Sequence, residues 1–174
     1  MNDHYRIRLT QPQEIPLLPE IERAAGWLFA GLDLVQDLEN GTRSIEELER
    51  AQKAGRLWVA TTPNGQPVGF AMAIEVDGVA HLDELDVHPD HGRRGLGTAL
   101  VETVCEWAKS AGFKAITLST FADVAWNAPF YARLGFHVLP EDELTDGLLR
   151  LREIEAGLGL PISKRVMMRR ELEE

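Results

Sequence analysis

The residues best suited to chemistry are concentrated in one stretch, 88–100, which reads HPDHGRRGLGTAL. Its glycines allow the backbone to turn sharply and to approach a ligand closely, because no Cβ intervenes. The amides that open the following helix point outward at the positive end of the helix dipole. Arg93 and Arg94 add positive charge beside them. The stretch therefore predicts a pyrophosphate site, with an ordinary structural turn as the alternative. The three glycines are Gly92, Gly95 and Gly97.

The elements before this loop restrict the class of phosphate-binding protein. Strands are predicted at 57–61, 68–76 and 79–87, joined by an Asn-Gly turn and an Asp-Gly turn, which are strong hairpin signals. A dinucleotide-binding fold would instead place a βαβ unit around the loop. No lysine follows the glycines where a nucleotide triphosphate loop has one. Both of those folds are disfavoured.

The rest of the chain alternates between helical and strand patterns. Apolar spacing predicts helices at 17–29 and 44–54, the second with a Ser44 cap and Glu47 at the capping-box position. A helix follows the loop at 95–110, and residues 140–163 are expected to be partly helical. The other elements are strands at 5–9, 115–120, 136–139 and 165–169 and a short helix at 128–134. This order predicts an α/β protein with a mixed sheet.

The composition fits one globular domain over residues 1–174, with 44% hydrophobic and 26% charged residues. The net charge of −10 argues against a nucleic-acid partner and is compatible with a cationic substrate. The sequence has neither an apolar run of the roughly 20 residues that span a bilayer nor the apolar core of a signal peptide. We therefore expect no membrane partner and a cytoplasmic location. The single cysteine, Cys105, is expected to be a buried core thiol.

Two motifs resemble those of the GNAT N-acyltransferase superfamily. The first, VHPDHGRRGLG at 87–97, looks like its acyl-CoA signature. The second, WNAPFYARLGF at 126–136, looks like the motif in which an Asn and a Tyr precede a Gly-Phe pair. The resemblance implies a mostly antiparallel central sheet of about seven strands, flanked by about four helices. In the middle of this sheet it implies a splayed parallel pair, 79–87 and 115–120.

The resemblance also implies acetyl-CoA as the cosubstrate and assigns residues to it. The pantetheine arm is expected at Leu85, Asp86, Val87, Asn127, Phe130 and Tyr131. The pyrophosphate is expected at the amides of Gly92, Arg93, Arg94, Gly95, Leu96, Gly97 and Thr98. One position departs from the family, because Gly92 stands where Gln or Arg is usual. Arg93 or Arg94 is expected to replace the missing side-chain contact.

Acyl transfer to an amine needs a proton acceptor for the ammonium, a donor to the thioester oxygen and a proton for the thiolate. The resemblance assigns the oxygen to the strand amide at Val87 and the thiolate to Tyr131, whose phenol can donate a hydrogen bond. Tyr131 could instead be a core aromatic residue beside Phe130. Asn127 could cap the helix that it precedes, as well as contact CoA.

Three residues of the strand 79–87 are alternatives for the proton acceptor: His81, Glu84 and Asp83. Histidine has the more suitable reference pKa, about 6.5 against about 4 for a carboxyl group. Strand alternation places His81 and Asp83 on one face and Glu84 and Asp86 on the other. The apolar residues change parity midway, which predicts a bulge and leaves the choice open. A solvated acidic patch that only attracts an amine is a further alternative.

We therefore expect an acetyl-CoA-dependent N-acetyltransferase that acts directly, in a ternary complex, on a primary amine of a small molecule or peptide. The alternatives are a non-catalytic acyl-CoA-binding or regulatory domain and a transferase for a bulkier acyl-CoA. No metal is expected, because His88 and His91 lack a ligand set of suitable spacing. A homodimer is compatible with the resemblance, since many members of the superfamily dimerise. Residues that could line the acceptor pocket or attract a cationic acceptor are Trp27, Phe29, Asp33, Asp37 and Glu39.

Overall fold

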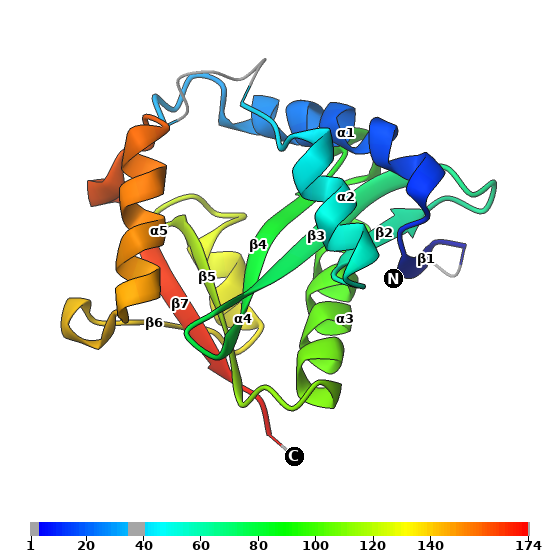
Figure 1. Ribbon diagram of the computed structural model, residues 1–174. Helices are drawn as coiled ribbons and strands as arrows, with labels where there is room; N and C mark the ends of the chain where they lie inside the picture. Colours follow the sequence, from blue (N-terminus) through cyan, green and yellow to red (C-terminus); the bar gives the residue numbers. More distant parts are fainter. Residues whose placement is uncertain (1–3, 35–40, 174) are drawn as a thin grey trace. The chain divides into compact units, whose positions relative to one another are not determined.

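The computed structural model describes residues 4–34 and 41–173 (Figure 1). Within these residues, seven strands form one sheet in the order β1-β2-β3-β4-β5-β7-β6. The strands are β1 (Arg6–Leu9), β2 (Leu57–Thr61), β3 (Pro67–Val76), β4 (Val79–Val87), β5 (Ala115–Phe121), β6 (His137–Val138) and β7 (Arg165–Glu171). The α-helices are α1 (Leu18–Gly26), α2 (Ile45–Lys53), α3 (Leu96–Ser110), α4 (Ala128–Arg133) and α5 (Asp146–Gly157). The 3-10 turns are η1 (Pro12–Leu17), η2 (Trp27–Phe29), η3 (Pro89–His91), η4 (Glu141–Glu143) and η5 (Ile162–Lys164).

The middle of the sheet contains the expected parallel pair, β4 and β5. Ala80, His81 and Leu82 pair with Ile116, Thr117 and Leu118. β1–β2, β2–β3, β5–β7 and β6–β7 are antiparallel pairs. The predicted α/β class and mostly antiparallel sheet of about seven strands are confirmed. The described residues contain five α-helices, in line with the roughly four expected, and the segment 140–163 is partly helical as predicted, with α5 at Asp146–Gly157.

The chain divides into two compact units. The first contains Met1–Ile74 and Asp83–Val104, and the second contains Glu75–Leu82 and Cys105–Glu174. β3, β4 and α3 each run from one unit into the other.

In the first unit, α1 and α2 cover one face of β2 and β3 (Figure 1). All five residues of β2 are buried, as expected for the continuous apolar run LWVAT. Ser44 caps α2, since its Oγ accepts a hydrogen bond from the Glu47 amide at 3.1 Å. Each fully buried leucine contributes about 1.5–3 kcal/mol to stability. The core cluster that results contains Ile15, Leu18, Ile21, Leu48, Ala51, Leu57, Val59, Phe70 and Met72.

In the second unit, β7 pairs with β5 and with β6, and α5 packs on this part of the sheet (Figure 1). Leu148 of α5 belongs to a buried cluster with Leu139 and Met167. The hairpin turn between β3 and β4 fixes the start of α5, because Oδ2 of Asp77 accepts a hydrogen bond from the Gly147 amide at 2.8 Å. A Cβ on Gly147 would lie 2.5 Å from this oxygen, so the contact requires glycine.

Two predicted elements are shorter than the sequence indicates. The helix expected at 17–29 is α-helical only over Leu18–Gly26 and tightens into η2 at Trp27–Phe29. The strand expected at 136–139 is reduced to His137–Val138, because the Phe136 amide donates to the Tyr131 carbonyl at 3.2 Å and closes α4 instead. None of the helices in the described ranges is long and apolar enough to cross a membrane.

Candidate active site

The loop between β4 and α3 has the backbone of an anion-binding turn. Gly92 is extended (φ −67°, ψ 165°), whereas Arg93 (φ 59°) and Gly95 (φ 79°) are left-handed. Left-handed residues in a turn aim nearby N–H groups at one point, which is how backbone nests hold anions. Gly95 adopts this conformation without steric cost, but Arg93 carries a Cβ and is strained. The loop thus combines an anion-binding backbone with local strain at Arg93.

α3 begins directly after this loop, at Leu96. The Ala99 amide donates to the Gly95 carbonyl at 3.0 Å and so starts the helical hydrogen-bond pattern. The earlier amides of the first turn have no acceptor within the helix, and they lie at the positive end of its dipole. Leu96 is 1% exposed, whereas Arg93 and Arg94 are exposed. The backbone is therefore anchored while two guanidinium groups are available at the surface.

Two histidines support the shape of the loop. Nδ1 of His91 lies 2.7 Å from the Tyr5 hydroxyl, and the two rings meet edge to face with centroids 5.8 Å apart. Nδ1 of His88 accepts a hydrogen bond from the Asp90 amide at 3.1 Å, and the His91 amide donates to the His88 carbonyl at 2.9 Å. Both imidazoles are thus engaged in holding η3.

Gly69 on β3 allows close packing beneath this end of β4. A Cβ at this position would lie 3.0 Å from the Asp86 carbonyl oxygen, 3.3 Å from Cγ2 of Val87 and 3.5 Å from Cδ1 of Leu100. A larger residue would push apart the strand and helix that flank the loop. Nothing in the sequence singles out Gly69, because a lone glycine in a strand has no local signal of this role.

A group of carboxyl groups lies on β4 beside the loop. Glu84 and Asp86 share a face, as strand alternation predicts, and they meet Glu22 of α1. Oxygen atoms of the three side chains lie within 4.8 Å of one another. Carboxylates this close repel one another unless a cation or a shared proton offsets the charge.

Arg43 supplies that cation from the segment that precedes α2. Its Nε donates to Oε2 of Glu84 at 3.0 Å. Its Nη2 donates to the Asp83 carbonyl at 2.8 Å, and its Nη1 lies 2.9 Å from Oδ2 of Asp83 and 3.2 Å from Oε2 of Glu47. Its backbone amide donates to both carboxylate oxygens of Glu22, at 2.8 and 3.0 Å. We call these six residues the Arg43 cluster: Glu22, Arg43, Glu47, Asp83, Glu84 and Asp86.

The electrostatics of the Arg43 cluster are those of crowded acids. Burial raises the pKa of Glu22 to about 8, and the nearby charge of Glu84 adds to the effect. Burial, together with Glu84, also raises the pKa of Asp86 well above its usual value, and burial raises the pKa of Asp83 against the effect of Arg43. Oδ2 of Asp86 is buried and has no hydrogen-bond partner among the residues that the structure describes. The cluster therefore holds one cation and more acid than that cation balances.

His81 lies inside the sheet of the second unit and is 2% exposed. Its Nδ1 is 2.8 Å from Oγ1 of Thr117, the residue paired with it on β5. The Thr117 hydroxyl can donate to the Ala80 carbonyl at 3.4 Å, in which case its oxygen accepts from Nδ1–H of His81. This is the geometry of a buried polar pair between adjacent strands.

The second motif forms α4 and its flanks. Tyr131 is 9% exposed, and its ring contacts Phe130 and Phe136 edge to face, with centroids 5.0 and 5.8 Å away. Asn127 precedes the helix, as predicted, but its side chain does not cap it. Instead, its Oδ1 accepts a hydrogen bond from the Phe121 amide at 3.3 Å and ties the helix start to β5.

The predicted site residues fall in both units. The first contains Asp83, Glu84, residues 85–87 and the loop 92–98. The second contains four predicted residues: His81, Asn127, Phe130 and Tyr131. Within the first, the structure adds Glu22 and Arg43, which the sequence analysis missed. Of the residues expected to attract a cationic acceptor, Asp37 and Glu39 lie outside the described residues.

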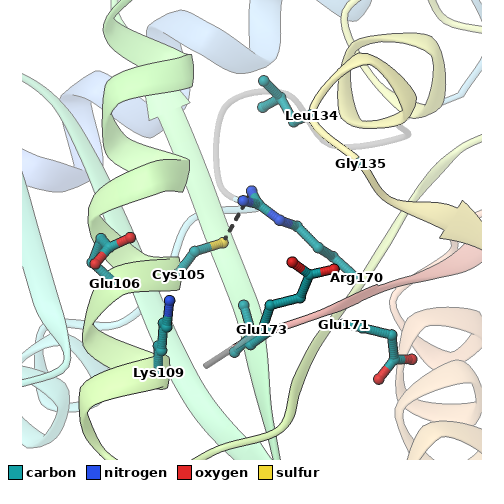
Figure 2. Close-up of a pocket in the computed structure, with 9 residues that line it drawn as sticks. Cys105, Glu106, Lys109, Leu134, Gly135, Arg170, Glu171 and Glu173 are labelled. Atoms are coloured by element: carbon teal, nitrogen blue, oxygen red, sulfur yellow. Dashed lines mark hydrogen bonds between the residues drawn. The ribbon is translucent and has the colours of Figure 1, made fainter.

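A cavity of about 430 Å³ lies in the second unit, between α3 and the end of β7 (Figure 2). Arg170 reaches across it and donates to Sγ of Cys105 at 3.6 Å. Lys109 and Glu173 also line it, but none of the predicted site residues does. Cys105 is 2% exposed, which confirms the expected buried thiol.

Comparisons with known proteins agree with the two motifs. The model of the Acetyltransferase (GNAT) family matches residues 23–136. The chain is 38% identical over 95 residues to an uncharacterized N-acetyltransferase of Methanocaldococcus jannaschii, which covers 51% of this chain and 41% of that protein. It is 32% identical over 90 residues to a peptidyl-lysine N-acetyltransferase of Salmonella typhimurium, covering 52% and 56%. The matches thus span about half the length of these curated relatives.

The fold is also similar to a solved structure, the PaiA N-acetyltransferase of Thermoplasma acidophilum in complex with coenzyme A. The TM-score is 0.71 at 21% identity, over 96% of this chain and 98% of that one. The likeness therefore extends beyond the matched segment to nearly the whole described fold.

Proposed function

Because the chain belongs to the acetyltransferase (GNAT) family, we propose that it transfers an acetyl group from acetyl-CoA to a primary amine, directly and in a ternary complex. Residues 1–174 act as one acyltransferase domain, and the amine belongs to a small molecule or a peptide. The observation that carries the proposal is the loop between β4 and α3. Its left-handed Arg93 and Gly95 lead directly into a helix start, with two exposed arginines beside it.

Acetyl-CoA is held in this proposal by backbone more than by side chains. The amides of residues 92–98 bind the pyrophosphate, and Arg93 and Arg94 supply the charge that Gly92 does not. The backbone of residues 85–87 binds the pantetheine arm. Asn127 and Phe130 are the further contacts that the second motif implies. Since Oδ1 of Asn127 already accepts from Phe121, its contact with CoA uses the side-chain N–H groups.

The reaction is attack of the free amine on the thioester carbonyl. The ammonium first gives one proton to the base, and the amide of Val87 donates to the oxygen as negative charge develops. The C–S bond then breaks, and the Tyr131 phenol protonates the thiolate. One of the two protons left on the attacking nitrogen returns to the tyrosine, the other stays as the amide N–H, and the base releases its proton to water. The products are the acetylated amine, CoA thiol and one proton.

Glu84 is the base in this proposal. Its side chain is 22% exposed, and it stands in a cluster whose excess of acid attracts a cationic amine. The other two candidates are more fully engaged, since His81 is buried against Thr117 and Asp83 contacts Arg43 through both its carboxylate and its carbonyl. Proton transfer through one water molecule is compatible with this position.

The experiment is a thermal-shift titration with acetyl-CoA, paired with a thiol-release assay over a panel of amines. We expect about 2.7 kcal/mol of stabilisation at 100 times the dissociation constant. Gly95→Ala should abolish this shift, because a Cβ disturbs the left-handed turn. Gly65→Ala is the matched control, since Gly65 is also left-handed (φ 83°), lies in a hairpin turn and has open space around it. Both variants lose roughly 1–2 kcal/mol of folding stability.

The outcomes separate the possible functions. No shift with the wild-type protein would exclude acetyl-CoA as its cosubstrate. A shift without thiol release on any amine would instead favour a non-catalytic acyl-CoA-binding domain. A larger shift with a longer acyl-CoA would favour a transferase for that donor.

A further inference from the structure

We propose that Arg43 is the positioning residue for Glu84, holding the carboxylate of the proposed base in one orientation from a segment that the family motifs do not include. The inference rests on the proposed function in so far as Glu84 is the base. In this role Arg43 itself touches neither acetyl-CoA nor the amine. Its effect is exerted through Glu84.

The guanidinium is occupied by contacts inside the protein. Nε binds Glu84, Nη1 contacts Asp83 and Glu47, and Nη2 binds the Asp83 carbonyl, at distances from 2.8 to 3.2 Å. Four of its five N–H donors can be assigned to these partners. These contacts fix the orientation of the guanidinium and occupy its donors, so it is not available to bind a substrate carboxylate. Arg43 therefore serves β4 and leaves substrate binding to other groups.

The segment that carries Arg43 is itself held in place. Its backbone amide donates to both oxygens of Glu22 on α1. The next residue, Ser44, caps α2 by accepting from the Glu47 amide. Both helices pack into the core of the first unit. The position of the guanidinium is thus set by two helices. Through its contact with Nε, the Glu84 carboxylate is held in a fixed position as well.

The contacts with both Asp83 and Glu84 give Arg43 an orienting role that a surface ion pair lacks. Asp83 and Glu84 are adjacent on β4, and the carboxylate of each reaches the same guanidinium, although strict strand alternation would place them on opposite faces. One cation that binds the carboxylate of each, and the carbonyl between them, fixes the strand at the base. The Arg43 side chain is 25% exposed and the two carboxylates are 15% and 22% exposed, so solvent screens these pairs less than it screens exposed ones.

The test compares Arg43→Gln with Arg8→Gln. Arg8 is a matched control, because it also forms an ion pair with a glutamate of the first unit, Glu14, but does not belong to the Arg43 cluster. We expect Arg43→Gln to lower kcat about 100-fold, the order expected for misplacing a catalytic group. Its acetyl-CoA affinity should stay within about twofold of wild type, since the loop 92–98 is untouched. Arg8→Gln should retain the wild-type kcat.

Two further measurements distinguish positioning from general stability. In a Glu84→Gln background, Arg43→Gln should cause no further loss of kcat, because its effect passes through Glu84. Arg43→Lys should recover only part of the rate, because an ammonium cannot reproduce the fork.

The carboxyl ¹³C signal of Glu84 in labelled protein makes the inference independent of turnover. Its chemical shift should change in Arg43→Gln, which removes the contact with Nε, and not in Arg8→Gln. An unchanged signal, or an equal loss of kcat from Arg43→Gln in the wild-type and Glu84→Gln backgrounds, overturns the positioning role. If the wild-type protein acetylates no amine, the proposed function fails, and the carboxyl signal still decides whether Arg43 orients Glu84.

Discussion

Two arginines of the first unit pair with glutamate in different surroundings. Arg8 donates two hydrogen bonds of 2.8 Å to Glu14, and the Gln11 amide donates to the same carboxylate at 2.8 Å. One cation meets one buried carboxylate, and the hydrogen bonds from Arg8 lower the pKa of Glu14. Arg43 instead meets several carboxyl groups, and the pKa of Glu22 beside it is still raised to about 8.

The difference separates a structural ion pair from a candidate site. The Arg8–Glu14 pair is balanced and joins β1 to η1, which is a role within the fold. The Arg43 cluster contains more carboxyl groups than its one cation can balance, so the repulsion between these groups is not fully offset. Such perturbed groups concentrate at functional sites, because catalysis and ligand binding need charges that folding alone would neutralise.

The largest expected effect is the difference in kcat between the variants Glu84→Gln and Glu14→Gln. Glu84→Gln should lower kcat by about 10²–10⁴-fold, the usual contribution of a general base, while acetyl-CoA still stabilises the protein. Glu14→Gln should leave kcat unchanged, because it removes a scaffold contact. Thiol release at saturating substrates measures both. Equal rates for Glu84→Gln and wild type would remove Glu84 from the mechanism and return the choice to His81 and Asp83.

A smaller effect is expected from Glu22→Gln on the pH dependence of stability. The folded-state pKa of Glu22, about 8, lies above its ordinary value of 4.5, so the folded protein binds more protons than the unfolded chain between these pH values. Its free energy of unfolding must then fall as pH rises from about 4.5 to about 8, by up to a few kcal/mol. Glu22→Gln should flatten this fall, as measured by urea unfolding at several pH values. A variant that loses stability with pH as steeply as wild type would show that Glu22 is ionised in the folded state.

The smallest effect is expected from Glu14→Gln on stability, and it has the opposite pH dependence. The pKa of Glu14 is lowered, so its contribution to the free energy of unfolding is present above about pH 4.5 and is lost as pH falls through the folded-state pKa. Glu14→Gln should cost about 1–3 kcal/mol at pH 7, because Arg8 loses its partner. Urea unfolding at pH 7 and pH 3 should show the difference from wild type shrinking at the lower pH. A difference that grows on acidification would contradict the balanced pair.

The parts of the molecule that depend on local backbone chemistry follow from the sequence. The Asn-Gly and Asp-Gly turns predict the hairpins, and Gly65 and Gly78 are left-handed as such turns require. The Ser44 cap and the start of α3 after Gly95 are likewise local signals that the structure confirms. The backbone of the candidate phosphate site belongs to this predictable class, because glycines and a helix start specify it within a few residues.

The side-chain networks do not follow from the sequence, because they join elements that are distant along the chain. Arg43 and Glu84 are 41 residues apart, and nothing in the segment before Ser44 indicates that its arginine reaches β4. On residue type alone His81 has the most suitable reference pKa of the three candidates, and its buried position against Thr117 does not follow from the sequence. Asn127 similarly has the residue type of a helix cap but binds Phe121. A cytoplasmic location and a homodimer remain predictions.

The Asp77 turn has a consequence for how the chain can change in evolution. Hairpin tips are usually the places where insertions and cuts are tolerated. Here Asp77, itself left-handed, binds the start of α5, where Gly147 leaves no room for a side chain. An added residue at this tip would move the carboxylate away from the Gly147 amide and remove one of the two side-chain contacts that hold the start of α5, 70 positions later in the chain, the other being the Thr145 cap. Insertions should therefore not be tolerated at this hairpin tip. They should be tolerated at the Asn64-Gly65 tip, whose glycine has open space around it.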